Sequence, residues 1–318
     1  MLQCFMPFNQ LRSVDVCTSA HNEEDAIDLF MSAILELFHL YPNYAWRLII
    51  VDNGSQDATW DKIEEIARQD SRVKGIKLTR NFGFESAIMA ALDSSNADAS
   101  IIMASDLQDN PNQIPLFIER FENGYDHVFQ VVNDRPSISS TRRLLTKIFY
   151  QWGSFLTSGK ITPNATDFRM ISKRLRDLLM QTPDRSRLNR AILNFFAFRF
   201  AAIEIPRGYR ETGKSKTNFK FALSLGIRGI FANSKRLLDY VGLLSLWMVG
   251  ITGLTLFASV FLFIFIGVPF GGFGTIVGLL LLLFAFNFLA LGIISQYLAI
   301  IMEIVQKRPI FVVDRTIN

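Results

Sequence analysis

Two long runs without a charged residue constrain this chain more than any other feature. Val241–Gly267 and Phe270–Met302 contain no Asp, Glu, Lys or Arg. Each exceeds the roughly 20 residues that a helix needs to cross the hydrocarbon layer of a membrane. Pro269 and Gly271–Gly272 lie between them and indicate a turn. The pattern predicts two membrane-spanning helices joined by a very short loop; the alternative is a buried hairpin in a soluble protein.

Basic residues flank these runs and predict their orientation. Lys235–Arg236 precedes the first run and Lys307–Arg308 follows the second, whereas the connecting loop carries no positive charge. The positive-inside rule therefore places the N-terminal part and the C-terminus in the cytoplasm, with two spans in the cell (inner) membrane. Upstream, residues 207–238 mix eight basic residues with apolar ones. That mixture is typical of an amphipathic helix in the headgroup layer, with a solvated surface helix as the alternative.

These features divide the chain into four expected parts. Residues 1–206 form a cytoplasmic domain, 207–238 a basic amphipathic juxtamembrane segment, 239–304 a two-helix transmembrane hairpin, and 305–318 a cytoplasmic basic tail.

The first part repeats a strand, a polar loop and a helix. Apolar runs such as Leu48–Val51 and Ile101–Met103 are nearly continuous, as in parallel strands buried on both faces. The fold class is therefore α/β, with a mostly parallel, Rossmann-like sheet covered by helices on both faces. Ligands bind such sheets at the carboxyl ends of the strands. The loops that follow four of these strands carry Glu23, Asp52, Arg80 and Asp106. Their convergence predicts a nucleotide-like ligand.

The stretch Met103–Asp109 is a candidate metal site. Asp106 and Gln108 are two residues apart, so in an extended chain both side chains point to one side. Carboxylate and amide oxygens suit Mg²⁺ or Mn²⁺, which would also take diphosphate oxygens. The alternative is an ordinary acidic loop after a strand.

Other classes of protein fit the sequence poorly. The net charge of +4 is mild and does not indicate nucleic-acid binding. His21, His39 and His127 are scattered along the chain, so a histidine metal cluster is not expected. A transporter is not favoured either, because the two spans are few and contain no ionisable residue.

Six short motifs follow one another along the chain. They fall on Ser19–Glu23 (P-x-Y-N-E), Asp52–Asp57 (D-D-G-S-x-D), Arg80–Gly83 (R-N-x-G), Ala104–Asp109 (D-A-D-L-Q-D), Asp167–Arg169 (D-F-R) and Arg210–Lys216 (R-x-x-G-x-S-K). In this order they resemble the motifs, given in parentheses, of family 2 glycosyltransferases of the GT-A fold, and more narrowly of the polyprenyl-phosphate glycosyltransferases. The chain departs from the pattern at Ser19, His21, Asn53 and Ala104. Ala104 replaces one carboxylate and so weakens the expected affinity for metal.

The resemblance implies a role for each matching residue. Asp167 would be the catalytic base, with Arg210 and Lys216 at the departing diphosphate or the lipid phosphate. Mg²⁺ or Mn²⁺ would bind Asp106 and Gln108. The donor, a UDP- or GDP-sugar, would be bound by Ser19, His21, Glu23, Asp52, Asn53, Arg80, Ser105 and Asp106. Candidates for the phosphate of the lipid acceptor are Arg135, Arg143 and Arg169.

The implied reaction is an inverting, metal-dependent transfer of a sugar to undecaprenyl or dolichyl phosphate at the cytoplasmic face of the membrane. Its product would serve cell-envelope or O-antigen glycan modification. Three alternatives stay open: a non-catalytic membrane subunit that retains the fold, a transferase with another lipid acceptor, and a processive polysaccharide synthase. The last lacks its Q-x-x-R-W element here. Glycines in the spans are compatible with a homo-oligomer, and no motif selects the nucleotide or the sugar.

Overall fold

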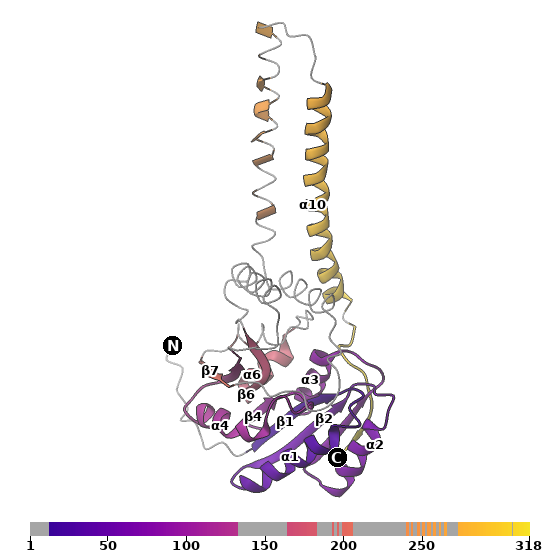
Figure 1. The fold of residues 1–318 in the computed structure, drawn as a ribbon, viewed down its shortest axis with the longest axis vertical. Coiled ribbons are helices and arrows are strands. Elements are labelled where there is room, and N and C mark those ends of the chain that lie inside the picture. The colour runs from indigo at the N-terminus through magenta and orange to yellow at the C-terminus, as the bar shows by residue number, and fades with distance from the viewer. Residues whose placement is uncertain are drawn as a thin grey trace.

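In a computed structural model, an eight-stranded sheet forms the centre of the globular part of the protein, at the end of the molecule opposite to the tip of helix α10 (Phe273–Val305) (Figure 1). The structure describes residues 13–132, 164–182, 193, 196, 199–205, single positions and short runs between 240 and 265, 273–306 and 308–318. The expected juxtamembrane segment 207–238 lies outside these residues.

The sheet has the order β7-β5-β6-β4-β1-β2-β3-β8, and its middle is parallel. The parallel strands at its centre are β4 (Ala99–Ile102), β1 (Ser13–Ala20), β2 (Ala45–Asp52) and β3 (Val73–Leu78). The flanking strands are β6 (Ala165–Ser172), antiparallel to β4; β5 (His127–Val131), antiparallel to β6; β7 (Phe200–Glu204), parallel to β5; and β8 (Val313–Ile317), antiparallel to β3.

Helices cover both faces of the sheet, as the sequence predicts. One face carries α1 (Ile27–Leu40), α2 (Thr59–Gln69), a short 3₁₀ turn (Pro111–Gln113) and α4 (Ile114–Glu122); the other carries α3 (Phe84–Asp93) and α6 (Lys173–Gln181). Alternate strand residues serve the two cores: Leu48 and Ile50 face the first, whereas Ile49 and Val51 face the second. This double burial explains why the strands read as continuous apolar runs.

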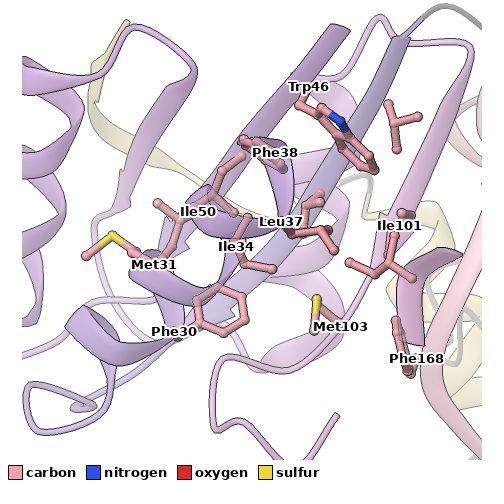
Figure 2. Close-up of a cluster of buried hydrophobic side chains, with 14 of the residues drawn as sticks. Phe30, Met31, Ile34, Leu37, Phe38, Trp46, Ile50, Ile101, Met103 and Phe168 are labelled. Carbon is pink, nitrogen blue, oxygen red and sulfur yellow. The ribbon is translucent and has the colours of Figure 1, made fainter. Parts of the chain in front are cut away.

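The first core anchors the loops that build the site (Figure 2). Phe38 stacks on Trp46 at one end of this core, with ring centroids 5.1 Å apart. At the other end, the ring centroids of Phe168 and of Phe117 in α4 are 4.3 Å apart, and Met103 is fully buried. Because Met103 precedes the 104–109 loop and Phe168 follows Asp167, this packing fixes both polar segments against one hydrophobic base.

Helix α10 (Phe273–Val305) projects away from the sheet (Figure 1). Its segment Leu282–Met302 has the length and composition of a membrane span. The segment has 21 residues and a mean hydropathy of 1.9, and none of its most apolar stretch is buried inside the structure. It is the one such helix among the described residues, so the second expected span is not confirmed. Described positions of the first apolar run do lie beside α10, because Val241 and Met248 share a hollow with Leu283 and Phe286.

The chain returns to the sheet after α10, which the sequence did not predict. Residues 313–317 were expected within a basic tail, but they form β8 on the exposed edge of β3. Ile317 packs where a Cβ on Gly75 would stand, and the Asn318 side-chain amide donates to the carbonyls of Ala67 and Val73. The sequence of β8 has little apolar character, so its side chains do not explain its position. Without β8, the edge of β3 would present unpaired backbone N–H and C=O groups, and β8 pairs with these groups.

His127 on β5 gives the fold a pH dependence. Its ring is fully buried, neither ring nitrogen has a hydrogen-bond partner in the described part of the chain, and burial holds its pKa well below 6.5. The nearby positive charge of Arg169 lowers the pKa of His127 further. The folded protein thus keeps His127 neutral, while the unfolded chain takes up a proton below about pH 6.5.

We expect stability to fall as the pH drops below 6.5, by at most about 1.4 kcal/mol per pH unit from this residue. His127→Phe should flatten that part of the profile, since no proton is then bound by the unfolded chain at this position. His39→Gln, at an exposed position on α1, is the control and should keep the wild-type slope. Thermal unfolding between pH 7 and 5 measures the effect, and equal slopes for wild type and His127→Phe would contradict it.

Candidate functional site

A polar hollow of about 550 Å³ lies at the carboxyl ends of the parallel strands. Three loops and one edge strand meet there, because parallel strands end at the same side of a sheet. The hollow is lined by His21 and Asn22 after β1, by Gly54, Ser55 and Gln56 after β2, by Lys77, Leu78, Thr79, Arg80 and Asn81 at the end of β3, and by Asp314 of β8.

Hydrogen bonds fix the first loop to the second. The backbone N–H of Asn22 donates to Ser55 Oγ (3.0 Å), and Asn22 Oδ1 accepts from the N–H of Gln56 (2.9 Å). The N–H of Glu23 donates to Thr59 Oγ1 at 3.0 Å. Asn22 has a φ of 52°, a left-handed conformation that asparagine tolerates better than most residues. Together these bonds fix the first loop against Ser55 and Gln56, which also line the hollow.

Asp52 is a buried carboxylate at the end of β2, hydrogen-bonded to Ser55 of the hollow's lining. Its side chain is inaccessible to solvent, and its Oδ1 accepts a hydrogen bond from the N–H of Ser55 at 3.0 Å. Its Oδ2 has no partner within the described residues. Burial raises the pKa of Asp52, while the Ser55 hydrogen bonds and the charges of Lys77 and His21 oppose that rise. An N–H group of a ligand would satisfy Oδ2 and offset the desolvation of the charged form.

Asn53 and Gly54 join the second loop to the third. Asn53 Nδ2 donates to Asn81 Oδ1 (3.2 Å), and Asn53 Oδ1 accepts from the N–H of Phe82 (2.9 Å). Arg80 stays exposed, with its guanidinium 4.1 Å above the ring of Phe82. Asn53 therefore positions the Arg80 loop, a role that the second aspartate of the family pattern would fill less well, since a carboxylate has no N–H to donate.

The 104–109 loop lies at the end of β4. Ser105 is buried and its hydroxyl donates to the carbonyl of Ser19 at 3.0 Å, which ties this loop to β1. Asp106 and Gln108 are half-buried, and the N–H of Gln108 donates to Asp106 Oδ1 at 3.2 Å. Leu107 between them has a φ of 57°. Such strain in a non-glycine residue persists where the surrounding structure imposes it, often at a binding site.

The 104–109 loop suits a metal that is shared with a substrate. In the described ranges no three His, Cys, Asp or Glu side chains gather as a metal cluster. One carboxylate and one amide oxygen are nevertheless enough for Mg²⁺ or Mn²⁺, since these ions keep several waters and take phosphate oxygens from the substrate. The residues present fit an open site of that kind and do not form a closed protein cage.

Asp167 is brought next to this loop by the pairing of β4 with β6. Ile102, the last residue of β4, is opposite Arg169 in that antiparallel register. Two positions further along the same line, beyond the last paired residues, come Ala104 and Asp167. The Asp167 side chain is 35% exposed, whereas that of Arg169 is 3% exposed. Arg169 Nη2 lies 4.0 Å from Asp167 Oδ1 and donates to the carbonyl of Thr166. Arg169, a lipid-phosphate candidate from the sequence, is thus buried behind Asp167 in the described structure.

The remaining predicted residues Arg135, Arg143, Arg210 and Lys216 lie outside the described residues. Four residues of the hollow lie outside every motif found in the sequence: Lys77, Leu78, Thr79 and Asp314. Lys77 directly precedes the last residue of β3, and its position at a strand end was a usable signal. Asp314 gave no such signal, because nothing in the sequence shows that β8 adds to the sheet.

Comparison with known proteins places these features in a family. The family described as "Glycosyl transferase family 2" matches residues 15–179. A glycosyltransferase of Synechocystis sp. is 28% identical over 299 residues, covering 92% of each chain. The SfII prophage-derived bactoprenol glucosyl transferase of Shigella flexneri is 28% identical over 306 residues, covering 95% of this chain and 98% of its own. Among solved structures, mannosyl-3-phosphoglycerate synthase from Rubrobacter xylanophilus aligns with a TM-score of 0.49 and 15% identity, over 72% of this chain and 75% of that one.

Gly54 and Gly83 test how much the site depends on close contact between loops. Both have a positive φ, 69° and 89°, so alanine strains either position. A Cβ on Gly54 would also stand 2.7 Å from Arg80 Cα and from the backbone nitrogen of Asn81, whereas a Cβ on Gly83 meets nothing within 4 Å. We expect Gly54→Ala to lower the melting temperature more than Gly83→Ala does, because only the former pushes two backbones apart. Equal shifts in thermal unfolding would show that the loop contact does not matter.

Proposed function

The chain belongs to glycosyl transferase family 2, and from that premise we propose that it moves a sugar from a nucleotide-diphospho-sugar to the phosphate of a membrane polyprenol. The observation that carries the proposal is the return of the chain from α10 into the sheet. β8 follows a helix of membrane-spanning length after a short link and lines the hollow at the strand ends. A soluble donor pocket held close to a bilayer suits an acceptor that lives in the bilayer.

The pairing of β8 also supports two spans. β7 and β8 belong to one sheet, so any membrane crossings between Glu204 and Val313 must be even in number. Leu282–Met302 in α10 has the length for one crossing, and the uncharged run Val241–Gly267 supplies the second. The positive-inside rule, applied to Lys235–Arg236 and Lys307–Arg308, then supports a cytoplasmic position for the sheet at the cell membrane.

The donor is a UDP- or GDP-sugar and the acceptor is undecaprenyl or dolichyl phosphate. For the donor, the support is the hollow at the strand ends with the unsatisfied Asp52 Oδ2. For the acceptor, it is the printed name of the Shigella relative, a bactoprenol glucosyl transferase. Its product would enter cell-envelope or O-antigen glycan modification.

The reaction is a single displacement that inverts the anomeric carbon. An oxygen of the lipid phosphate attacks that carbon, the bond to the donor diphosphate breaks, and the nucleotide diphosphate leaves with the bonding electrons. The acceptor phosphate has a second pKa of about 6, so it is largely a dianion near neutrality and is already nucleophilic. Asp167 orients this phosphate or removes its remaining proton. Arg210 and Lys216 neutralise phosphate charge, and Mg²⁺ or Mn²⁺ bound by Asp106 and Gln108 would stabilise the leaving diphosphate.

A non-catalytic membrane subunit is the second candidate, and Ala104 favours it. This position carries a carboxylate in the family pattern, and an extension of the β4–β6 register by two positions would align it with Asp167. The transfer assay below separates the two candidates.

We expect the purified full-length protein in detergent to transfer sugar from a UDP- or GDP-sugar to undecaprenyl phosphate with Mg²⁺ or Mn²⁺. Asp106→Ala should lower the rate roughly 100-fold or more, the scale of losing one electrostatic stabiliser of the transition state. Asp61→Asn, an exposed acid on α2, should keep the wild-type rate. Formation of glycolipid is followed by chromatography. No product from a broad donor panel, together with no nucleotide binding by calorimetry, would favour the non-catalytic subunit.

Asp167→Asn separates a catalytic base from a positioning group. A base contributes typically 10²–10⁴-fold, so a loss of about that size in kcat with unchanged donor affinity would support proton removal. A loss below about tenfold would assign Asp167 to orientation of the phosphate alone. Asp93→Asn, exposed at the end of α3, is the control. The two readouts are kcat from the transfer assay and the nucleotide Kd from calorimetry.

A further inference from the structure

Asp314 occupies an irregular position in β8. Gly75, Ile76 and Lys77 of β3 pair in regular register with Ile317, Thr316 and Arg315. Leu78 then pairs with Val313, so Asp314 is an extra residue between the two pairs. An extra residue of this kind is a β-bulge, which re-aims the side chain it carries and is frequent beside active sites.

The bulge puts Asp314 on the wall of the hollow that holds Lys77 and Arg80. Its side chain is 44% exposed, and its ion pair with Arg315 Nε (3.2 Å) is exposed on both sides. Ion pairs of that kind contribute little to stability. A carboxylate held there by an irregular strand therefore has a weak structural role and is available to a ligand in the hollow.

The order of strands indicates which part of a nucleotide Asp314 meets. Asp106, the diphosphate and metal end of the site, follows β4. β8 is four strands further along the sheet, on the order of 19 Å at the usual strand spacing of about 4.8 Å. A ligand with its diphosphate at Asp106 extends past β1 and β2 towards β3 and β8. The base is the part farthest from the phosphates, so it is the part that approaches Asp314.

The chemistry of a carboxylate agrees with this placement. An ionised aspartate accepts hydrogen bonds and donates none, so it repels phosphate oxygens and base carbonyls but suits an N–H or amino group. We propose that Asp314 is a specificity-determining residue that accepts a hydrogen bond from an N–H or amino group on the edge of the donor's nucleobase. This inference rests on the proposed function, since it assumes a nucleotide donor in the hollow.

With this assignment, β8 both attaches the end of α10 to the sheet and contributes to binding of the donor. Asp314, which accepts the hydrogen bond from the base, lies on the strand that follows α10. That strand is held by pairing with β3 and by the hydrogen bonds of Asn318. The strand that follows α10 thus completes the donor site.

The test is isothermal titration calorimetry on the full chain in detergent with Mg²⁺, using UDP, GDP and inorganic diphosphate as probes. Asp314→Asn should raise the Kd of the nucleotide that the wild type prefers by about tenfold or more, which is the scale of one hydrogen bond to a charged group. It should also narrow the difference between UDP and GDP, because an amide both donates and accepts. Inorganic diphosphate should bind equally to wild type and variant.

Two further variants complete the design. Arg315→Gln removes the ion pair and leaves Asp314 in place, so it should bind as the wild type does. Asp314→Glu keeps the carboxylate and should retain part of the preference for one base. Unchanged nucleotide binding in Asp314→Asn would overturn the assignment, as would an equal loss of diphosphate binding, which indicates a structural role. A wild-type protein that binds diphosphate but no nucleotide would overturn the proposed function itself, and the role of Asp314 would fall with it.

Discussion

Parallel pairing of β1 with β2 and β4 is the constraint on which the site depends. Strands that run in one direction deliver their following loops to one edge, so the loops that carry Glu23, Asp52 and Asp106 lie at the same edge although they are far apart in sequence. The two cores that sandwich these strands hold the register, because a shift by one residue would move each apolar side chain to the opposite face. The chemistry of the loops therefore rests on the packing beneath them.

Backbone contacts between loops refine this arrangement. Gly54 permits the second loop to touch the backbone at Arg80, and Asn53 bridges the same two segments with its amide. The result leaves one oxygen of the buried Asp52 without a partner among the described residues. Such a group costs stability unless a ligand satisfies it, which is typical of residues retained for binding.

The strand β8 gives the C-terminal end of the chain two roles. It covers the edge of β3, and it ties the end of α10 to the wall of the hollow. Under the proposed function the acceptor lies in a bilayer, and such a reaction needs the donor pocket at a fixed height above that bilayer. A strand paired into the sheet provides that fixed attachment better than a free tail would, since its backbone hydrogen bonds leave little freedom of position.

The sequence by itself determined the α/β class, the doubly covered sheet, the loops that carry the polar residues and the apolar character of α10. These are local properties, visible in the continuous apolar run Leu48–Val51 or in the absence of charge from 270 to 302. Tertiary structure alone decided that β8 pairs with β3, that Asp314 faces the hollow and that Arg169 is buried behind Asp167. Strand pairing joins residues more than 200 positions apart through backbone groups that every residue shares. The side-chain pattern of β8 therefore could not predict which strand it pairs with.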